Sequence, residues 1–370
     1  MSEIMIVGDL FPTESNEKLF EKGDIDQLFG KEIRELFGRC EYRIANLEGV
    51  LTESSEKISK RGPCIKASPG CMTAIKRMNI DCLSLANNHI LDYGEKGLAS
   101  TCKAIRDAGA AYVGVGDNMD EMKKVHRFEV DHMQIGVLSC AEYEFSIATK
   151  HHAGANPFDA LEILDDIAAL KESCDYVIVL YHGGKEYYRY PAPYVQKRCR
   201  KMAEKGADLV LCQHSHCIGC MEEYHGATIV YGQGNFLFDF GGNEFKNTGL
   251  MITANPRSKA IRFYPVLRKN NTVRIASETL SKKVLREFEK RSGEIKKEEF
   301  VAKRYEKLAQ ETLLSYKLLS LGKITKILRK LHMLKLLDKI YDRETKLAFM
   351  NMLNCEAHHD LYIEGLKQEL

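Results

Sequence analysis

The residues of this sequence best suited to chemistry are two histidines one residue apart, His214 and His216, directly after the apolar run of residues 209–212. In extended backbone, residues i and i+2 point to the same side. If the chain stays extended here, both imidazoles face one point beyond the C-terminal end of a strand, where open α/β sheets place their sites. Two converging imidazoles favour Zn, Mn or Fe over Ca or Mg. The pair by itself is equally compatible with two polar residues in a loop, so the other elements decide.

Further polar side chains stand at the ends of other apolar runs. They are Asp9, Glu48, Asn88 with His89, and His182. One Asp or Asn after a strand is ordinary turn chemistry, but a series of strand ends that supplies mainly His, carboxylate and Asn exceeds what turns require. Carboxylates can bridge two cations, while His and Asn complete the ligand shells. This composition predicts a two-metal hydrolytic centre.

Six short motifs occur along the chain in a fixed order: GD, NLEG, NNH, HGG, HxH and GNF. Over about residues 3–265, this order resembles the poly-γ-glutamate (capsule) biosynthesis family typified by CapA, a family similar in fold to the calcineurin-like metallophosphatases. The resemblance implies an α/β protein, a layered αββα metallophosphatase-like sandwich, with a centre for divalent transition metals.

The resemblance also implies roles for single residues. Glu48 takes the place of a carboxylate that bridges two metals, and His89 matches the catalytic acid or substrate-binding histidine. Asn235 matches a residue that is either structural or in contact with substrate. In this interpretation a metal-bound hydroxide attacks the substrate while His89 protonates the leaving group. The implied metal ligands are Asp9, Glu48, Asn88, His182, His214 and His216.

The sequence departs from the family pattern at two points. The phosphatases carry D-x-H at the first motif, but here Asp9 is followed by Leu10 and Phe11, so that histidine ligand is absent. Gln213 precedes the closing pair where Gly is usual. The first metal site is therefore expected to be weaker, or to fill only with substrate bound, and one or two divalent ions (Mn, Fe or Zn) are compatible with the sequence.

The loop of residues 57–69 carries several cations beside the expected metal edge. These side chains either form a solvated loop or bind an anionic substrate, and we assign Lys60, Arg61 and Lys66, together with Asn235, to substrate binding. Asp92 either orients His89 or begins the next helix, and the sequence favours the second role.

The elements that must position these residues alternate along the chain. Apolar runs predict strands over 3–8, 41–47, 80–86, 111–116, 174–181 and 207–213, and a hairpin that turns near 131–133. Helical periodicity covers 16–38, with an interruption near Gly23, and also 69–79, 95–108, 158–173 and 193–205. Short strands follow between 227 and 277. Strand–helix alternation followed by consecutive strands predicts a layered α/β domain with a mixed sheet pair, expected to span residues 1–280.

Residues 281–370 have a different texture, strongly helical and rich in Lys, Glu and Leu, and predict a C-terminal helical extension. Within 317–339 there are seven Lys or Arg and one Asp. A basic amphipathic helix can lie on an anionic membrane or bind a protein partner, but packing on its own domain or oligomerisation is favoured. The apolar stripe of this segment consists of Ile324, Ile327, Leu328, Leu331 and Leu334.

Composition bounds the remaining possibilities. The net charge of +2 does not indicate a nucleic-acid partner. No apolar run reaches the ~18 residues of a membrane span, and the acidic, polar N-terminus is not typical of a secretory signal. The 12 cysteines are scattered through apolar segments, so buried thiols and a cytoplasmic location are expected. Cys212, Cys217 and Cys220 have the spacing of iron–sulfur ligands, but core thiols are favoured.

Taken together, these features predict a cytoplasmic, metal-dependent hydrolase or transferase. Its expected partner is an anionic small-molecule or polymer substrate related to the cell envelope, cleaved at a γ-glutamyl amide or a phosphoester. One alternative is a phosphatase or phosphodiesterase of a small metabolite. Another is a non-catalytic scaffold of a capsule polymer assembly that docks through its helical tail, which metal-dependent turnover would exclude.

Overall fold

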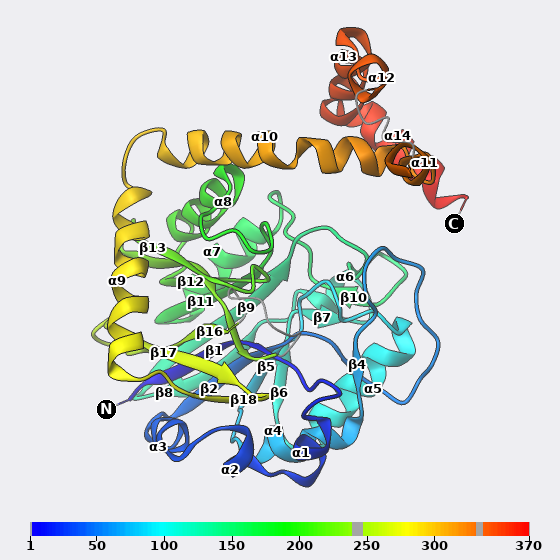
Figure 1. Cartoon of the computed structure of the whole chain (residues 1–370). Helices are drawn as coiled ribbons and strands as arrows, with labels where there is room; N and C mark the ends of the chain where they lie inside the picture. The colour runs from blue at the N-terminus through cyan, green and yellow to red at the C-terminus, as the bar shows by residue number, and fades with distance from the viewer. Residues whose placement is uncertain (1, 239–246, 331–335, 370) are drawn as a thin grey trace. The chain divides into compact units, whose positions relative to one another are not determined.

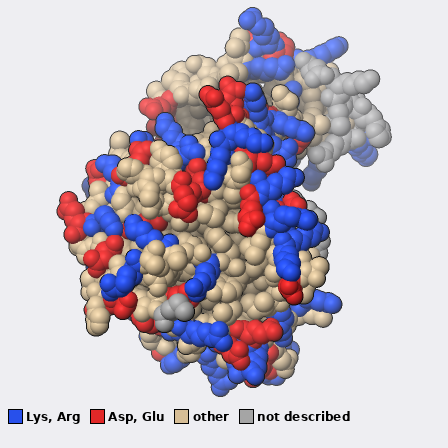
Figure 2. All heavy atoms as spheres, turned by 90° about the vertical axis from the view of Figure 1, so that its left-hand side faces the viewer, with Lys and Arg blue, Asp and Glu red and all other residues tan. Residues whose placement is uncertain are grey.

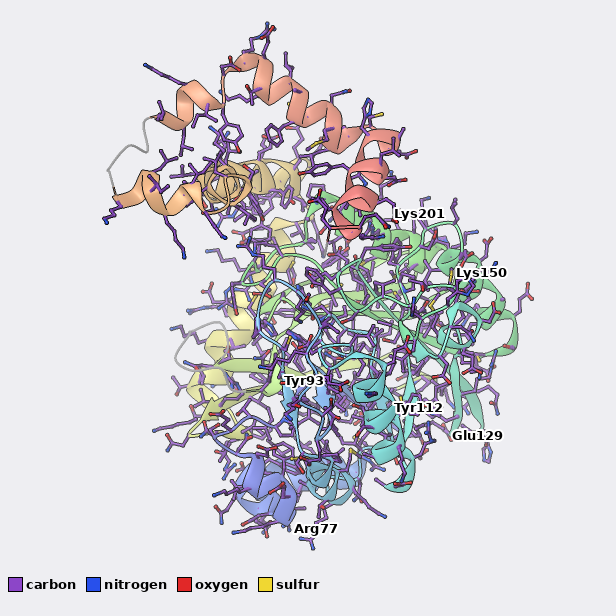
Figure 3. All side chains as sticks on the ribbon, turned by 90° about the vertical axis from the view of Figure 1, so that its right-hand side faces the viewer. Arg77, Tyr93, Tyr112, Glu129, Lys150 and Lys201 are labelled. Carbon is purple, nitrogen blue, oxygen red and sulfur yellow. The ribbon has the colours of Figure 1, made fainter. Side chains whose placement is uncertain are left out.

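The computed structural model describes residues 2–238, 247–330 and 336–369 (Figure 1). The chain consists of two compact units, Met1–Val301 and Ala302–Leu370. The first unit extends beyond the boundary expected at residue 280 and contains the sheets. On the face shown in Figure 2, Lys and Arg side chains are interspersed with Asp and Glu. Charged side chains such as Arg77 and Glu129 lie at the periphery and point away from the core (Figure 3).

The first sheet has eight strands in the order β18-β17-β16-β1-β2-β5-β6, and β15 also pairs with β1. Strands β1, β2, β5 and β6 run parallel to one another, so their carboxyl ends meet at one edge of the sheet. The bounds are β1 (Ile4–Leu10), β2 (Tyr42–Leu47), β5 (Cys82–Ser84), β6 (Ala111–Val113), β15 (Asn235–Leu237), β16 (Thr248–Ala254), β17 (Ile261–Lys269) and β18 (Thr272–Ile275).

The second sheet has six strands in the order β13-β14-β12-β11-β9-β8. Strands β9, β11, β12 and β14 are parallel. The bounds are β8 (His126–Val130), β9 (Met133–Ala141), β11 (Tyr176–His182), β12 (Leu209–Gln213), β13 (Ile218–Tyr224) and β14 (Ala227–Gln233). Two short pairs complete the strands: β3 (Val50–Leu51) with β4 (Lys66–Ala67), and β7 (Val115–Gly116) with β10 (Gly154–Ala155).

The two sheets pack face to face and helices cover their outer faces. One buried apolar cluster joins Ile6 and Ile44 of the first sheet to Leu180 and Leu211 of the second. The central parallel strands are buried on both faces, so their sequences are continuous apolar runs. This is why they could be predicted from the sequence. Figure 1 shows the resulting layers, and the expected αββα sandwich is confirmed. Helices α1 (Glu17–Lys22), α2 (Ile25–Leu28), α3 (Lys31–Arg39), α4 (Met72–Arg77) and α5 (Gly94–Asp107) lie on the first sheet, and α7 (Ile163–Ser173) and α8 (Pro193–Glu204) lie on the second. The short helices η1 (Pro69–Cys71) and α6 (Met119–Met122) lie in connections.

Two glycines decide where elements end. Gly23 has φ +67 and its N–H closes α1 by donating to the carbonyls of Leu19 and Phe20, which confirms the interruption expected there. Residues 111–116 were expected to form one strand, but Gly114, with φ +88, divides them into β6 and β7, which belong to different sheets. A side chain at Gly114 would collide with Ser139, so the break requires glycine.

Helix α9 (Glu278–Glu294) belongs structurally to the first unit, although the sequence placed it in the helical extension. It packs on β13 and β17, and Phe288 joins the cluster between the sheets. Arg291 donates from Nε to the carbonyl oxygen of Gly219 at 2.7 Å. The structural division therefore falls after this helix.

The second unit is helical, as expected. Its helices are α10 (Phe300–Ser320), α11 (Ile324–Lys330), α12 (Leu337–Ile340), α13 (Arg343–Asn354) and α14 (Glu356–Lys367). Within the expected apolar stripe, Leu328 is buried while Ile324 and Ile327 are exposed, and Leu331 and Leu334 lie outside the described residues. Among the described helices, none combines the length and apolar character needed to cross a bilayer.

Candidate metal centre

The carboxyl ends of parallel strands from both sheets bring the six expected metal ligands together. Asp9 lies in β1, Glu48 follows β2, Asn88 follows β5, and His182 ends β11. His214 and His216 follow β12. Apart from Asn88, which is half-buried, each of these side chains is more than nine-tenths buried.

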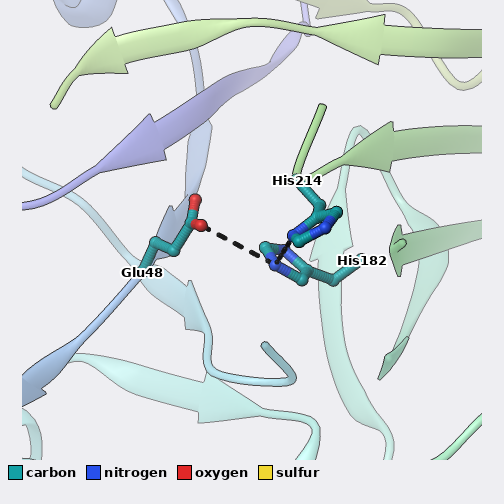
Figure 4. Close-up of side chains that lie close together, drawn as sticks. All are labelled: Glu48, His182 and His214. Atoms are coloured by element: carbon teal, nitrogen blue, oxygen red, sulfur yellow. Dashed lines mark hydrogen bonds and ion pairs between the residues drawn. The ribbon is translucent and has the colours of Figure 1, made fainter. Parts of the chain in front are cut away.

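The first group of ligand atoms comes from Glu48, His182 and His214 (Figure 4). His182 Nε2 lies 3.1 Å from His214 Nδ1 and 3.8 Å from Glu48 Oε1. Asn88 Oδ1 lies 3.1 Å from the same His182 nitrogen. Two imidazoles, a carboxylate and an amide oxygen thus converge, a donor set typical of Zn, Mn or Fe sites.

The second group consists of Asp9, Glu48 and His216. His216 lies between two carboxylates, with Nδ1 3.4 Å from Asp9 Oδ2 and Nε2 3.6 Å from Glu48 Oε1. Phe11 is buried and packs edge-on against Phe238 at 6.0 Å, and contributes no ligand. Because both groups include Glu48, this carboxylate stands where it can bridge two ions.

The electrostatics of the residues fit a bound cation. Burial lowers the pKa of His182 well below its usual value, and the neighbouring histidines His214, His216 and His89 act in the same direction. The pKa of His214 is also lowered, mainly by burial and secondly by the neighbouring His216. Neutral imidazoles are the form that ligates metals. Asp9 Oδ2 is buried and accepts no hydrogen bond from any described residue, a cost that a cation at this point would offset.

Two buried amides hold the ligands in place. Asn46 donates from Nδ2 to Asp9 Oδ1 at 2.8 Å, and the same nitrogen lies 3.5 Å from His182 Nδ1. Asn235 Oδ1 lies 2.9 Å from His216 Nδ1, and its Nδ2 donates to the carbonyl of Phe238. Partners of this kind orient ligating imidazoles. Of the two roles left open for Asn235, its contacts support the structural one.

The backbone at the two closing histidines differs from the extended form on which their convergence was predicted. Strand β12 ends at Gln213, and His214 and His216 adopt φ values of +84 and +54. In this left-handed bend the two rings lie 6.1 Å apart and serve different ligand groups. The convergence was predicted but its geometry was wrong, because residue spacing alone does not show where a strand ends. Left-handed backbone at non-glycine residues is costly and is concentrated at functional sites.

His89 is oriented by Asp92, contrary to the role favoured from the sequence. Its Nδ1 lies 2.7 Å from Asp92 Oδ2, and the same oxygen accepts the Ile65 N–H at 2.6 Å. Helix α5 begins at Gly94 with Tyr93 at its N-cap, so Asp92 does not begin that helix. Asn87 fixes the turn, since it donates to the Leu47 carbonyl and accepts from the His89 N–H.

The three cations assigned to substrate binding occupy different environments. The ammonium of Lys60 forms an ion pair with Asp92 Oδ1 and lies 3.2 Å from His89 Nδ1, with its side chain 4% exposed. Arg61 is exposed. Lys66 donates to the Ser54 carbonyl at 2.7 Å. Lys60 therefore lies beside His89 but is engaged with a carboxylate, and the structure does not gather the three cations at one point.

Tyr187 lies beside the candidate site and is not among the residues selected from the sequence. It has φ +59, and its N–H donates to the carbonyl of Ser215, the residue between the two closing histidines. Its ring lies 6.0 Å from that of His216. Burial, with the negative charges of Glu186 and Glu48, raises the pKa of Tyr187 to about 12. The repeated tyrosines after the HGG motif were the available indication.

The cysteines stay outside the centre. Cys212, Cys217 and Cys220 are buried, and Cys212 Sγ lies 3.5 Å from the sulfur of Cys199. Within the described part of the chain, the candidate ligand groups contain no cysteine. The preference for core thiols over an iron–sulfur cluster agrees with these positions.

Comparison with known proteins identifies relatives of this arrangement. Residues 3–240 match the model of the bacterial capsule synthesis protein family PGA_cap. The capsule biosynthesis protein CapA of Bacillus anthracis is 29% identical over 255 residues, which cover 66% of this chain and 62% of the relative. The PGA biosynthesis protein CapA of Bacillus subtilis (strain 168) is 28% identical over 249 residues, covering 66% and 65%. The match thus spans less than two thirds of the length of either relative.

A solved structure of a novel phosphatase from Mycoplasma pneumoniae superposes with a TM-score of 0.44 at 14% identity, covering 72% of this chain and 93% of that one. The segment matched by the family model contains both ligand groups and the His89–Asp92 pair. This matched segment covers well over half of the sequence. The chain therefore belongs to the bacterial capsule synthesis protein family.

Proposed function

We propose that this protein is a metal-dependent hydrolase or transferase that acts on an anionic polymer or another envelope-related substrate. The observation that carries the proposal is the pair of buried ligand groups that share Glu48. The relatives are described as proteins of capsule and PGA biosynthesis, which supports a polymer of this kind as the substrate.

The protein's own groups supply positioning and a proton. Divalent ions held by the two ligand groups would lower the pKa of a water molecule and polarise an oxygen of the substrate. His89 uses Nδ1 for Asp92, which leaves Nε2 to protonate the leaving group. Tyr187 stands beside His216, and its N–H holds the carbonyl of Ser215, so it helps to position the bend that carries the two closing histidines.

Charges around the centre support an amide substrate over a phosphoester. Glu142 and Glu144 line a small cavity together with Asn88, His182 and His214. Glu142 is paired with Arg198 at 3.1 Å, whereas Glu144 is exposed. A carboxylate at this position attracts the amine released from an amide bond, and the divalent ions held by the two ligand groups would offset its repulsion of an anionic substrate. A γ-glutamyl amide is therefore the favoured bond.

The test uses the full chain purified without chelator. Its metal content is measured by mass spectrometry, and turnover is assayed on γ-glutamyl peptides and on phosphoesters. Glu48→Gln is expected to lose metal and turnover together, while the exposed control Glu129→Gln retains both. Unchanged metal content in Glu48→Gln would contradict the site. A metal-loaded wild type that turns over no member of the panel would support the scaffold alternative instead.

A further inference from the structure

The second unit has a small core among the residues that the structure describes. Its buried apolar cluster there consists of Leu318, Leu328, Leu337 and Tyr341. Helices α13 and α14 contain no buried residue at all. Even small domains bury about 60% of the surface that their unfolded chain exposes. Among the described residues, α13 and α14 thus add no buried side chain to this core, and their apolar side chains are available to a further surface.

Apolar side chains available for such packing are concentrated in the same unit. Among the described residues, every exposed large apolar side chain lies between Leu313 and Leu366 except Tyr143, Phe145, Leu161 and Tyr194. Ile324 and Ile327 of α11 are more than half exposed, as are Leu353 of α13 and Leu361 of α14. A concentration of this kind marks an interaction surface.

The charge distribution indicates what this surface contacts. Residues 317–339 contain seven Lys or Arg and one Asp, whereas residues 342–370 contain six Asp or Glu and three Lys or Arg. An anionic bilayer would attract the first segment and repel the second. A second copy of the chain presents both segments, so that each basic segment can meet an acidic one.

We propose that the second unit is a self-association surface, in which α13 and α14 of one copy pack on α10 and α11 of another. A two-fold axis relates the copies, so that the same pair of contacts forms twice. In this arrangement we expect the apolar side chains of α13 and α14 to cover Ile324 and Ile327, and Lys326 to meet Glu364 of the other copy. This inference is independent of the catalytic proposal, because the unit contains none of the candidate ligands.

The test measures the mass of the full chain by light scattering and sedimentation equilibrium over a range of concentrations. We expect a dimer whose dissociation constant rises by about tenfold or more in Leu353→Glu, since central apolar anchors dominate interfaces. The matched control is Leu161→Glu, which is 86% exposed in the first unit and should not change the mass.

Charge reversal adds a test that misfolding cannot imitate. Lys326→Glu and Glu364→Lys should each weaken the dimer, and the double variant should recover it because complementarity is restored. A monomer at all concentrations, or a dimer indifferent to every substitution, would overturn the proposal. So would a monomer in solution that pellets with phosphatidylglycerol vesicles, since the bilayer would then be the partner.

Discussion

His89 Nδ1 lies 2.7 Å from Asp92 Oδ2, and the ammonium of Lys60 is held against the same pair. The three side chains form a buried cluster beside the two candidate ligand groups, and none of the three belongs to either group. His89 directly follows Asn88, whose Oδ1 lies 3.1 Å from His182 Nε2, and this places His89 next to the candidate ligands. Asp92 fixes the orientation of the ring, so the nitrogen that is not bonded to Asp92 is the one available to substrate.

Replacement of His89 should therefore separate proton transfer from metal binding. His89→Asn is expected to keep a metal content near that of the wild type and to lower turnover by ~10² to 10⁴, the usual contribution of general acid–base catalysis. The measurement combines metal analysis with steady-state kinetics. Parallel loss of metal and activity would show that His89 is a ligand.

Replacement of His214 should have the opposite profile. His214→Ala removes one imidazole from the first ligand group and should reduce bound metal at least ~10-fold, since even partners of ligands contribute that much. Circular dichroism checks the fold, and His132→Ala, whose side chain is 93% exposed, is the control. If His214→Ala binds metal like the control, the assignment fails.

The engagement of Lys60 with Asp92 predicts an effect on stability. Lys60→Met leaves the Asp92 carboxylate buried without its ammonium partner and should lower the free energy of unfolding by ~3 kcal/mol. Lys57→Met, at an exposed position of the same loop, should change it by no more than ~0.5 kcal/mol. Urea denaturation measures both, and equal stability of the two variants would contradict the ion pair.

The position of α9 predicts where the chain can be shortened. A chain that ends after Val301 should fold and bind metal, because both ligand groups and α9 are retained. A chain that ends after Leu280 loses Phe288 from the core, and removal of a buried Phe costs ~3–5 kcal/mol. Thermal unfolding and metal analysis compare the two. Equal stability would show that α9 is not part of the core.

Stability should also depend on pH through His126. Burial lowers the pKa of His126, whose Nε2 lies 2.5 Å from the Tyr42 hydroxyl. The unfolded chain then binds a proton more readily, so this contribution to stability is complete above pH ~6.5 and is lost as the pH falls toward the folded value. His126→Phe should lose less stability than the wild type between pH 7 and 5, as measured by urea denaturation at each pH. Parallel curves would contradict the shift.

The sequence predicted which residues would converge because each polar residue lies at the end of an apolar run, and parallel strands bring the ends of such runs to one edge. Spacing cannot show how side chains turn within the loops beyond that edge. The left-handed bend at His214 and His216 depends on where β12 ends, and the pairing of Asp92 with His89 depends on the loop of Lys60 that folds over both. Lys60 lies far from His89 and Asp92 in the sequence, so no local pattern encodes its contacts with them.

The boundary between the two units was hard to predict from the sequence for a related reason. Helix α9 has the same Lys-, Glu- and Leu-rich composition as the helices that follow it. Its few buried residues, among them Phe288 and Arg291, distinguish it only once β13 and β17 are in place.

The pairing of β1 makes the first strand of the chain depend on strands that are synthesised much later. The first strand lies inside its sheet between β2 and β16, and Asp9 is in register with Asn235 of β15. Its neighbours on one side are therefore translated long after it, and loop closure across such a distance is slow. Until they emerge, β1 presents an open edge that favours association with other chains. We therefore expect the candidate ligand group that contains Asp9 to form only after β15 and β16 have been synthesised.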